Sequence, residues 1–70
     1  MNNTNHPIKE EWEEYYMVLE GIRRTGVTNM YGASRYLQEF CPELSKEQAQ
    51  EILCNWMHNY SELNSRYGWQ

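Results

Sequence analysis

The feature that most constrains this sequence is the spacing of the apolar residues between Ser45 and Tyr67. Successive apolar side chains are three or four positions apart, which keeps them on one face of an α-helix. Ser45 and Gln48 have the spacing of a capping box, and Gly68 can adopt the left-handed conformation that ends a helix. The pattern therefore predicts one long C-terminal helix over residues 45–67. Its apolar residues are Ala49, Ile52, Leu53, Trp56, Tyr60, Leu63 and Tyr67.

Two further helices are predicted upstream. Residues 7–25 carry an apolar face from Ile8 to Ile22, with Pro7 suited to a first turn and Gly26 to a stop. Residues 30–40 carry a second apolar face, and Pro42 disfavours helical backbone at the residue before it. The apolar residues of this second face are Met30, Ala33, Leu37 and Phe40.

No segment has the alternating pattern of a strand, and the connections between the predicted helices are short. Short connections make neighbouring helices pack against each other. The sequence therefore predicts an all-α, three-helix domain over residues 7–70, preceded by a flexible N-terminal tail over residues 1–6. The predicted core residues are Trp12, Leu19, Ile22, Leu37, Phe40, Ile52, Leu53 and Trp56.

The charge of the chain bears on the classes of partner. Ten glutamates against six lysines and arginines give a net charge of −4, which repels nucleic acid and anionic membranes. No apolar run approaches about eighteen residues, and residues 1–7 have no signal-peptide pattern, so we expect a cytoplasmic protein without a membrane span. Cys41 and Cys54 are expected to be reduced thiols in that compartment.

The lengths of the predicted helices point to a partner surface. At 1.5 Å per residue the second helix is roughly 18 Å long and the third roughly 34 Å, so the second covers only half of the third. The uncovered C-terminal seam consists of Trp56, Tyr60, Leu63 and Tyr67. We expect this seam to bind a second copy of the chain, as a homodimer, or another protein.

Half of the acidic charge lies on the first predicted helix, including Glu10, Glu13 and Glu14. Acidic residues near a helix N-terminus are favoured by the helix dipole and keep the surface soluble. The alternative is that they dock on a basic surface of a partner protein. Both interpretations remain open at this point.

Sequence patterns typical of catalysis or of metal and cofactor binding are weak. Glu51, Cys54, His58 and Glu62 form one stripe on the third predicted helix. We interpret the stripe as a solvated face, because a structural zinc site needs four strong ligands and a nucleophile needs an orienting group. We therefore expect no metal, no cofactor and no enzymatic activity.

The second and third predicted helices could also be drawn as a DNA-binding helix-turn-helix. Gln48 and Gln50 could contact adenine edges in the first turns of the recognition helix. Glu47 and Glu51 would then face phosphates, which argues against nucleic acid as the partner.

Residues 26–33, Gly-Val-Thr-Asn-Met-Tyr-Gly-Ala, are followed by Tyr36-Leu37 and by a Leu44-Ser45 helix start. Over residues 19–57 this resembles a family of small bacteriophage proteins that carry a "GVTNM-aromatic-GA" connector. The resemblance implies a phage origin, and hence a host cytoplasm, without implying an activity or catalytic residues.

Residues 44–51 and the helix that follows are also similar to the second helix of the phycobilisome-degradation adaptors of cyanobacteria and their phages. That resemblance implies a helical hairpin dimer that tethers an antenna protein to a protease. The sequence thus favours a small, non-enzymatic protein-interaction module that binds and inhibits or redirects a host or phage protein. A helix-turn-helix DNA binder and an adaptor for phycobilisome degradation are the alternatives.

Overall fold

The computed structural model describes residues 7–26 and 32–69 of the chain. Within these ranges the regular structure is entirely helical, which confirms the predicted all-α class. The predicted tail over residues 1–6, the connector after Gly26 and the predicted helix start at residue 30 lie outside the described residues. None of the helices in the described ranges combines the length and apolar character that a membrane span requires.

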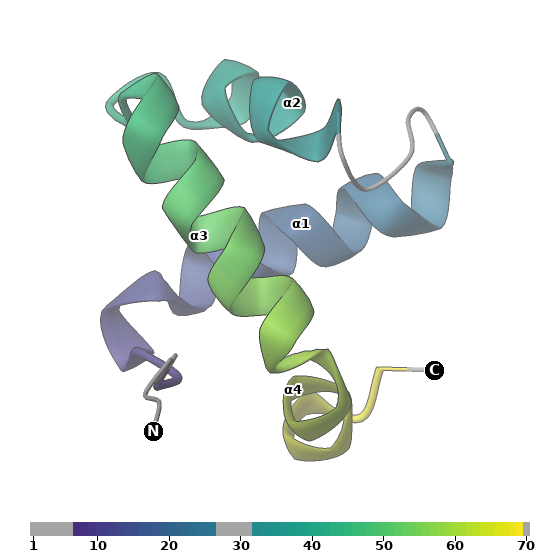
Figure 1. The fold of residues 1–70 in the computed structure, drawn as a ribbon. Coiled ribbons are helices and arrows are strands. Elements are labelled where there is room, and N and C mark those ends of the chain that lie inside the picture. The colour runs from purple at the N-terminus through teal and green to yellow at the C-terminus, as the bar shows by residue number, and fades with distance from the viewer. Residues whose placement is uncertain (1–6, 27–31, 70) are drawn as a thin grey trace.

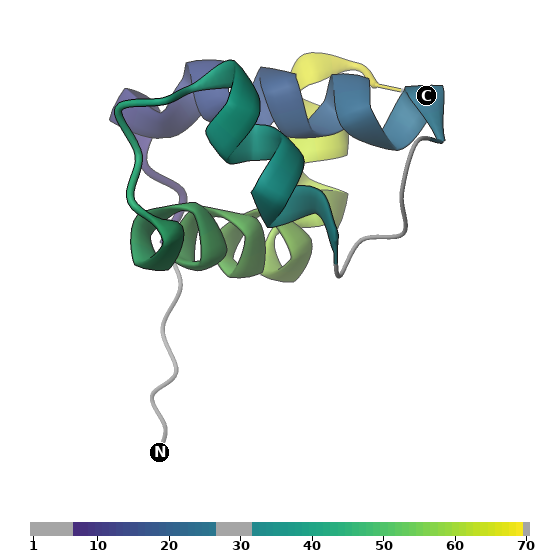
Figure 2. The ribbon, with the colours of Figure 1, turned by 90° about the horizontal axis from the view of Figure 1, so that it is seen from above.

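The two longest helices cross each other in separate layers, and a shorter helix packs against both of them. In Figure 1, α3 crosses in front of α1, α2 lies at one end of the crossing, and α4 follows α3 after a turn of the chain. Figure 2 shows the same arrangement from above, with α2 between the α1 layer and the α3 layer. The elements are η1 (Glu10–Trp12, a 3₁₀ turn), α1 (Glu13–Thr25), α2 (Ala33–Phe40), α3 (Lys46–His58) and α4 (Tyr60–Tyr67).

The first helix begins later than the sequence predicts. The prediction placed its start at Pro7, but Lys9 has extended backbone and the α-helix begins at Glu13, after the 3₁₀ turn. Two backbone groups of this segment are bonded to side chains of α1 and α3. The Pro7 carbonyl accepts a hydrogen bond from Asn55 at 2.8 Å, and the Lys9 N–H donates to the Tyr16 hydroxyl at 3.1 Å. The end of the helix is as predicted, with Gly26 at φ 69°.

A buried hydrogen bond between Tyr16 and Asn55 joins α1 to α3. The Tyr16 hydroxyl donates to Asn55 Oδ1 at 2.7 Å, and both residues are at least 96% buried. Together with the bonds to Pro7 and Lys9, this pair ties the segment before α1 to both crossing helices. Because each polar atom in the chain of bonds has a partner, the network can lie inside the core without a large desolvation penalty.

One predicted core residue lies on the surface. Helix α2 ends at Phe40, as predicted, but the Phe40 side chain is 67% exposed. The buried face of α2 follows Ala33 and Leu37 and continues to Cys41, which takes the inward position one turn after Leu37. Phe40 and Tyr36 flank that face, on the side toward α1. The prediction for Phe40 is therefore wrong, because the helix is rotated to bury Cys41.

The C-terminal helix starts as predicted but is divided into two. The Gln48 N–H donates to Ser45 Oγ at 3.1 Å, and the Ser45 N–H donates to Gln48 Oε1 at 2.9 Å, which completes the capping box. The helix breaks at Asn59, where φ is −104° and ψ is 14°. The Asn59 side chain donates to the Asn55 carbonyl at 3.0 Å, an oxygen that also accepts the Asn59 backbone N–H. The side chain and the backbone of Asn59 thus share one acceptor at the end of α3, where the chain turns into α4.

The break directs α4 back toward α1, and this closes the core (Figure 2). Leu63 of α4 is fully buried in the same cluster as Leu19 of α1 and Trp56 of α3. Six of the eight predicted core residues lie in this cluster, and Trp12 packs against its edge. The cluster consists of Tyr16, Leu19, Ile22, Ala33, Leu37, Cys41, Leu44, Ala49, Ile52, Leu53, Trp56, Leu63 and Trp69.

We predict that Asn55→Ala destabilises the fold by roughly 1–3 kcal/mol, because it removes the acceptor of the buried Tyr16 O–H and the donor to the Pro7 carbonyl. The measurement is urea-induced unfolding at pH 7. Gln50→Ala, an exposed substitution on the same helix, is the control and should change stability by less than about 0.5 kcal/mol. Equal effects of the two substitutions would contradict a stabilising role for the network.

Candidate functional site

The predicted C-terminal seam lies largely inside the fold. Trp56 is 1% exposed and Leu63 is fully buried, while Tyr60 and Tyr67 are half-buried and pack against the core. The seam therefore faces the chain's own α1, and the two fully buried side chains cannot serve as a docking surface in this fold. The premise of the homodimer prediction, a bare apolar seam, is not met.

The residue that covers much of this seam is Trp69, which sequence reasoning missed. Trp69 is 7% exposed, and its ring lies 5.4 Å from the Tyr67 ring and 5.9 Å from the Tyr60 ring, measured between centroids. The backbone N–H of Trp69 donates to the Asn64 carbonyl at 3.2 Å, and the preceding residue, Gly68, has φ 71°. An apolar residue directly after a C-terminal glycine is typical of a Schellman motif, so this signal was present in the sequence.

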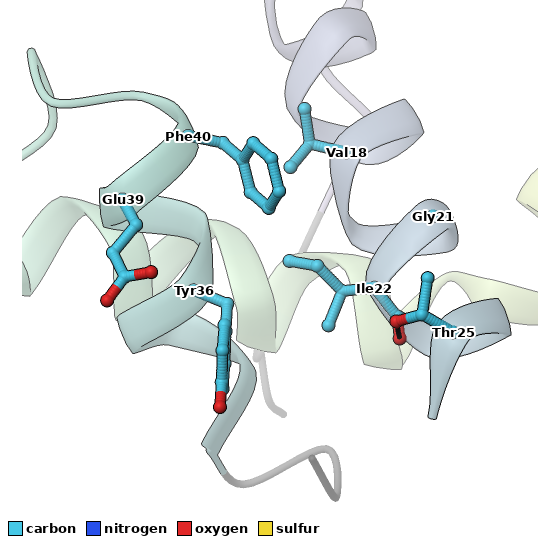
Figure 3. A pocket seen from close by; sticks show the side chains of 7 residues that line it. All are labelled: Val18, Gly21, Ile22, Thr25, Tyr36, Glu39 and Phe40. Atoms are coloured by element: carbon cyan, nitrogen blue, oxygen red, sulfur yellow. Dashed lines mark hydrogen bonds between the residues drawn. The ribbon is translucent and has the colours of Figure 1, made fainter. Parts of the chain in front are cut away.

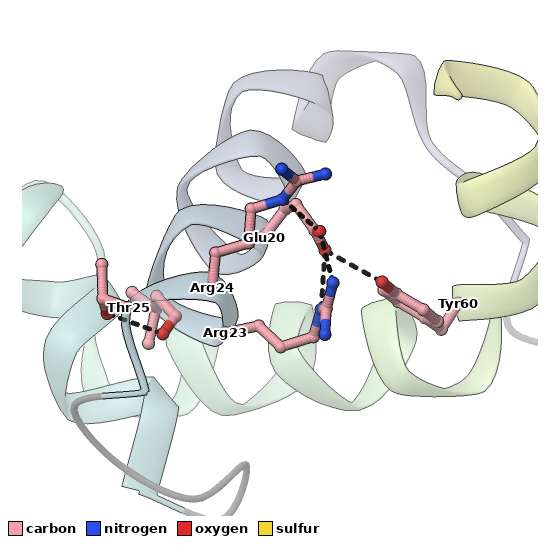
Figure 4. Close-up of polar contacts among 6 residues, drawn as sticks. Glu20, Arg23, Arg24, Thr25 and Tyr60 are labelled. Carbon is pink, nitrogen blue, oxygen red and sulfur yellow. Dashed lines mark hydrogen bonds and ion pairs between the residues drawn. The ribbon is translucent and has the colours of Figure 1, made fainter. Parts of the chain in front are cut away.

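Glu20 is a buried carboxylate that joins α1 to α4. Arg23 donates to both of its oxygens, at 3.1 and 2.8 Å, and Arg24 Nε donates to Oε2 at 2.8 Å. The Tyr60 hydroxyl donates to Oε1 at 3.1 Å, as Figure 4 shows. Since both carboxylate oxygens are occupied by donors, Glu20 is an anchor for α4 and has no free lone pair aimed at solvent.

The protonation of Glu20 follows from these contacts. Burial by itself raises the pKa of the carboxyl, but the hydrogen bonds from Arg23, Arg24 and Tyr60 outweigh it and hold the pKa below its ordinary value. Burial, together with the bond to Glu20, raises the pKa of Tyr60. The pair is therefore a carboxylate and a neutral phenol at neutral pH.

The predicted acidic patch lies on the surface. Glu10 of η1 and Glu13 and Glu14 of α1 are all exposed. Their placement in the first turns agrees with the helix dipole, as the sequence predicts. The next exposed residues along the outer side of α1 are Met17 and Gly21. The acidic patch thus continues along the helix into an apolar region.

Gly21 also lines an apolar groove between α1 and α2, which has a volume of about 500 Å³. In Figure 3 the Phe40 ring points from α2 toward Val18 and Ile22 of α1, and the groove lies between the two helices. We call this feature the α1–α2 groove. Among the described residues, its lining consists of Val18, Gly21, Ile22, Thr25, Tyr36, Glu39 and Phe40.

Gly21 leaves the groove open. It lies inside α1, where glycine costs about 1 kcal/mol relative to alanine. Apart from its own turn of helix, a Cβ atom at this position would meet no described atom within 4 Å, so packing against other elements does not require glycine there. The missing side chain instead widens the groove beside Phe40.

The charges beside the groove are acidic. Glu39 is the charged residue among its described lining residues, and Glu14 precedes Val18 by one turn of α1. Glu43 lies close by, where its Oε2 accepts a hydrogen bond from the Tyr15 hydroxyl at 2.9 Å. That bond, more than burial, raises the pKa of Tyr15. Burial first, and then the charges of Glu43 and Glu14, raise the pKa of the Cys41 thiol next to Phe40.

The stripe of Glu51, Cys54, His58 and Glu62 is exposed along α3 and α4. Within residues 7–26 and 32–69, no group of three or more histidine, cysteine or acidic side chains is arranged to hold a metal ion. Cys41 is a buried free thiol and Cys54 an exposed one. The stripe therefore offers a polar surface on the far side of α3 from the core.

Comparison of the chain with protein-family models, with curated proteins and with solved structures finds no match.

The contacts of Glu20 predict a pH dependence of stability. A lowered pKa in the folded state contributes stability above the ordinary carboxyl pKa, and this stability is lost as the pH falls through the folded value. We expect Glu20→Gln to cost roughly 1–3 kcal/mol at pH 7, toward the lower end because Arg23 and Arg24 are solvent-screened. The difference from wild type should shrink at pH 3, measured by urea unfolding at both pH values.

The matched control for this experiment is Glu62→Gln, which removes an exposed ion pair with Arg66 at 3.6 Å. It should change stability by less than about 0.5 kcal/mol at either pH. A cost of Glu20→Gln that stays the same at pH 7 and pH 3 would contradict the lowered pKa.

The open space at Gly21 predicts that Gly21→Ala stabilises the protein, by up to about 1 kcal/mol, because alanine is the better helix former and its Cβ meets nothing. This corresponds to a rise in Tm of about 4–8 °C in a thermal melt. Gly68→Ala is the control and should lower the Tm, because alanine is strained at the φ of 71° that Gly68 adopts. A lower Tm for Gly21→Ala would show that the groove is not open at that turn.

Proposed function

We propose that this chain is a small, non-enzymatic protein-interaction module that binds another protein through the α1–α2 groove. The observation that carries the proposal is the Phe40 side chain, which is 67% exposed at the edge of an open apolar groove. Exposed apolar patches of this kind, beside polar residues, are typical of protein-interaction sites. Large aromatic anchors contribute strongly to binding when a partner buries them.

The energetic cost of Phe40 and Gly21 to the isolated chain favours a role for both residues in binding rather than in stabilising the fold. Burying a phenylalanine side chain contributes about 1.5–3 kcal/mol, which this small domain forgoes at Phe40. It also keeps a glycine inside α1 where alanine would stabilise the helix. Both features reduce the stability of the isolated chain and both lie in one groove. A partner that fills the groove would recover the apolar burial that Phe40 forgoes.

The biological setting of the proposal comes from the sequence resemblance to small bacteriophage proteins. In that setting the module would act in a host cytoplasm, where it binds and inhibits or redirects a host or phage protein. The exposed Glu10, Glu13 and Glu14 patch precedes the groove along the chain, with Glu14 one turn before Val18, and would extend the contact.

The alternatives receive less support from the fold. The exposed first turns of α3 present Glu47 and Glu51, which would repel DNA phosphates from a recognition helix. The adaptor resemblance implies a two-helix hairpin, whereas α2 packs here between α1 and α3. A homodimer through Trp56 and Leu63 would require these buried residues to leave the core.

The proposal predicts that Phe40→Ser weakens partner binding at least about tenfold without unfolding the protein, because the side chain is mostly exposed. The measurement is affinity capture from the lysate of cells that naturally contain the protein, with quantitative mass spectrometry. A protein captured by wild type should fall at least about tenfold with Phe40→Ser, an effect of the size of a hot-spot residue.

The control is Met57→Ser, which removes an apolar side chain of 37% exposure on α3, away from the groove. It should capture the same protein as wild type. If Phe40→Ser captures every protein that wild type captures, at the same level, the groove is not the docking surface.

A further inference from the structure

We infer that the occupant of the α1–α2 groove is a basic peptide segment of the partner protein, in which a bulky apolar side chain is flanked by lysine or arginine. The apolar side chain would enter the space above Gly21 beside Phe40. The basic side chains would pair with Glu39 and Glu14. This inference rests on the proposed function and specifies the chemistry of the partner.

The unpaired state of the acidic residues supports a basic occupant. Among the described residues, Glu39 and Glu14 form no ion pair, and Glu43 accepts a hydrogen bond from Tyr15 but forms no ion pair. Glu20 and Glu62, by contrast, each have arginine partners within the described part of the chain. The carboxylates beside the groove, like the other exposed glutamates of the described residues, are therefore available to pair with another molecule, and what distinguishes Glu39 is that it lines the groove.

Within residues 7–26 and 32–69, the arginines of α1 and α2 form no ion pair with Glu39 or Glu14. Arg23 and Arg24 both bond Glu20 on the side of α1 that faces α4 (Figure 4). Arg35 is the basic residue within Ala33–Phe40, and it is not among the described residues that line the groove. A ligand in the groove therefore meets apolar side chains with carboxylates at their edge.

The same charges disfavour a second copy of the chain as the occupant. Two copies that met through this groove would bring Glu39 and Glu14 of each close to those of the other, in a protein of net charge −4. Like charges placed together at an interface are destabilising. An uncharged small molecule would fit the volume of about 500 Å³ but would leave the carboxylates unpaired. A basic segment satisfies both the apolar lining and the acidic edge.

The experiment selects binders from a yeast-displayed library of random 16-residue peptides, with purified wild-type protein as the bait. Selection is carried out at about 0.15 M salt, where long-range attraction to the net charge is largely screened. Enriched peptides are then synthesised, and their affinities for four variants are measured by fluorescence anisotropy. The variants are Phe40→Ser, Gly21→Leu, Glu14→Gln/Glu39→Gln and Glu47→Gln/Glu51→Gln.

The variants distinguish the contribution of the apolar groove to binding from that of the acidic side chains. Gly21→Leu places a good helix former in open space, so it should fold normally while it fills the groove. Glu14→Gln/Glu39→Gln removes two charges at the groove. Glu47→Gln/Glu51→Gln removes two exposed charges on α3 and is the matched control for net charge.

We expect the enriched peptides to carry a bulky apolar residue flanked by lysine or arginine. Their affinity should fall at least about tenfold with Gly21→Leu and with Phe40→Ser, which remove the apolar contact. It should fall about three- to tenfold with Glu14→Gln/Glu39→Gln, as for exposed charge pairs, and stay unchanged with Glu47→Gln/Glu51→Gln.

Other outcomes overturn the inference in distinguishable ways. Peptides without a basic bias that still depend on Gly21 and Phe40 would refute the charge argument and retain the docking function. If no peptide is enriched, or if the enriched peptides bind Gly21→Leu and Phe40→Ser with the same affinity as wild type, both the basic occupant and the docking function of the groove are refuted. A wild-type dimer in sedimentation equilibrium that Gly21→Leu converts to a monomer would identify a second copy as the occupant.

Discussion

The bond between Tyr16 and Asn55 sets the geometry on which the rest of the structure depends. It fixes the crossing of α1 and α3 at one buried point, because a buried 2.7 Å hydrogen bond tolerates little displacement. The same asparagine holds the Pro7 carbonyl, so the segment before α1 is fastened at the crossing too. Once α1 and α3 cross at this angle, α2 can cover only one end of the crossing and α4 the other.

The two ends of the crossing differ in how completely they are covered. At the α4 end, Glu20 bonds Tyr60 and the Trp69 ring closes over Tyr60, so the apolar seam is sealed by the chain itself. At the α2 end, the short helix buries Leu37 and leaves Phe40 beside an open groove. The exposed apolar surface therefore lies at the α2 end of the crossing, whereas the sequence predicted it at the α4 end.

Local rules in the sequence predicted the helices, the capping box and the two glycine stops, because these depend on residues close together in the chain. The break at Asn59 could not be predicted, since the apolar spacing runs through it without a shift and the turn depends on contacts with α1. The exposure of Phe40 follows from a rotation of α2 that buries Cys41 instead. Periodicity cannot resolve that rotation, because both residues lie near the edge of the same apolar face.

The Asn55 bonds also have a consequence for how the chain acquires its structure during synthesis. Asn55 is 39 residues from Tyr16 and 48 from Pro7, so both contacts must overcome the loop-closure entropy of long segments. Until Asn55 has left the ribosome, α1 lacks the partner that fixes its position, and a helix of 13 residues is marginal on its own. The nascent α1 therefore gains its stable conformation only when α3 arrives, and the domain folds as one unit rather than helix by helix.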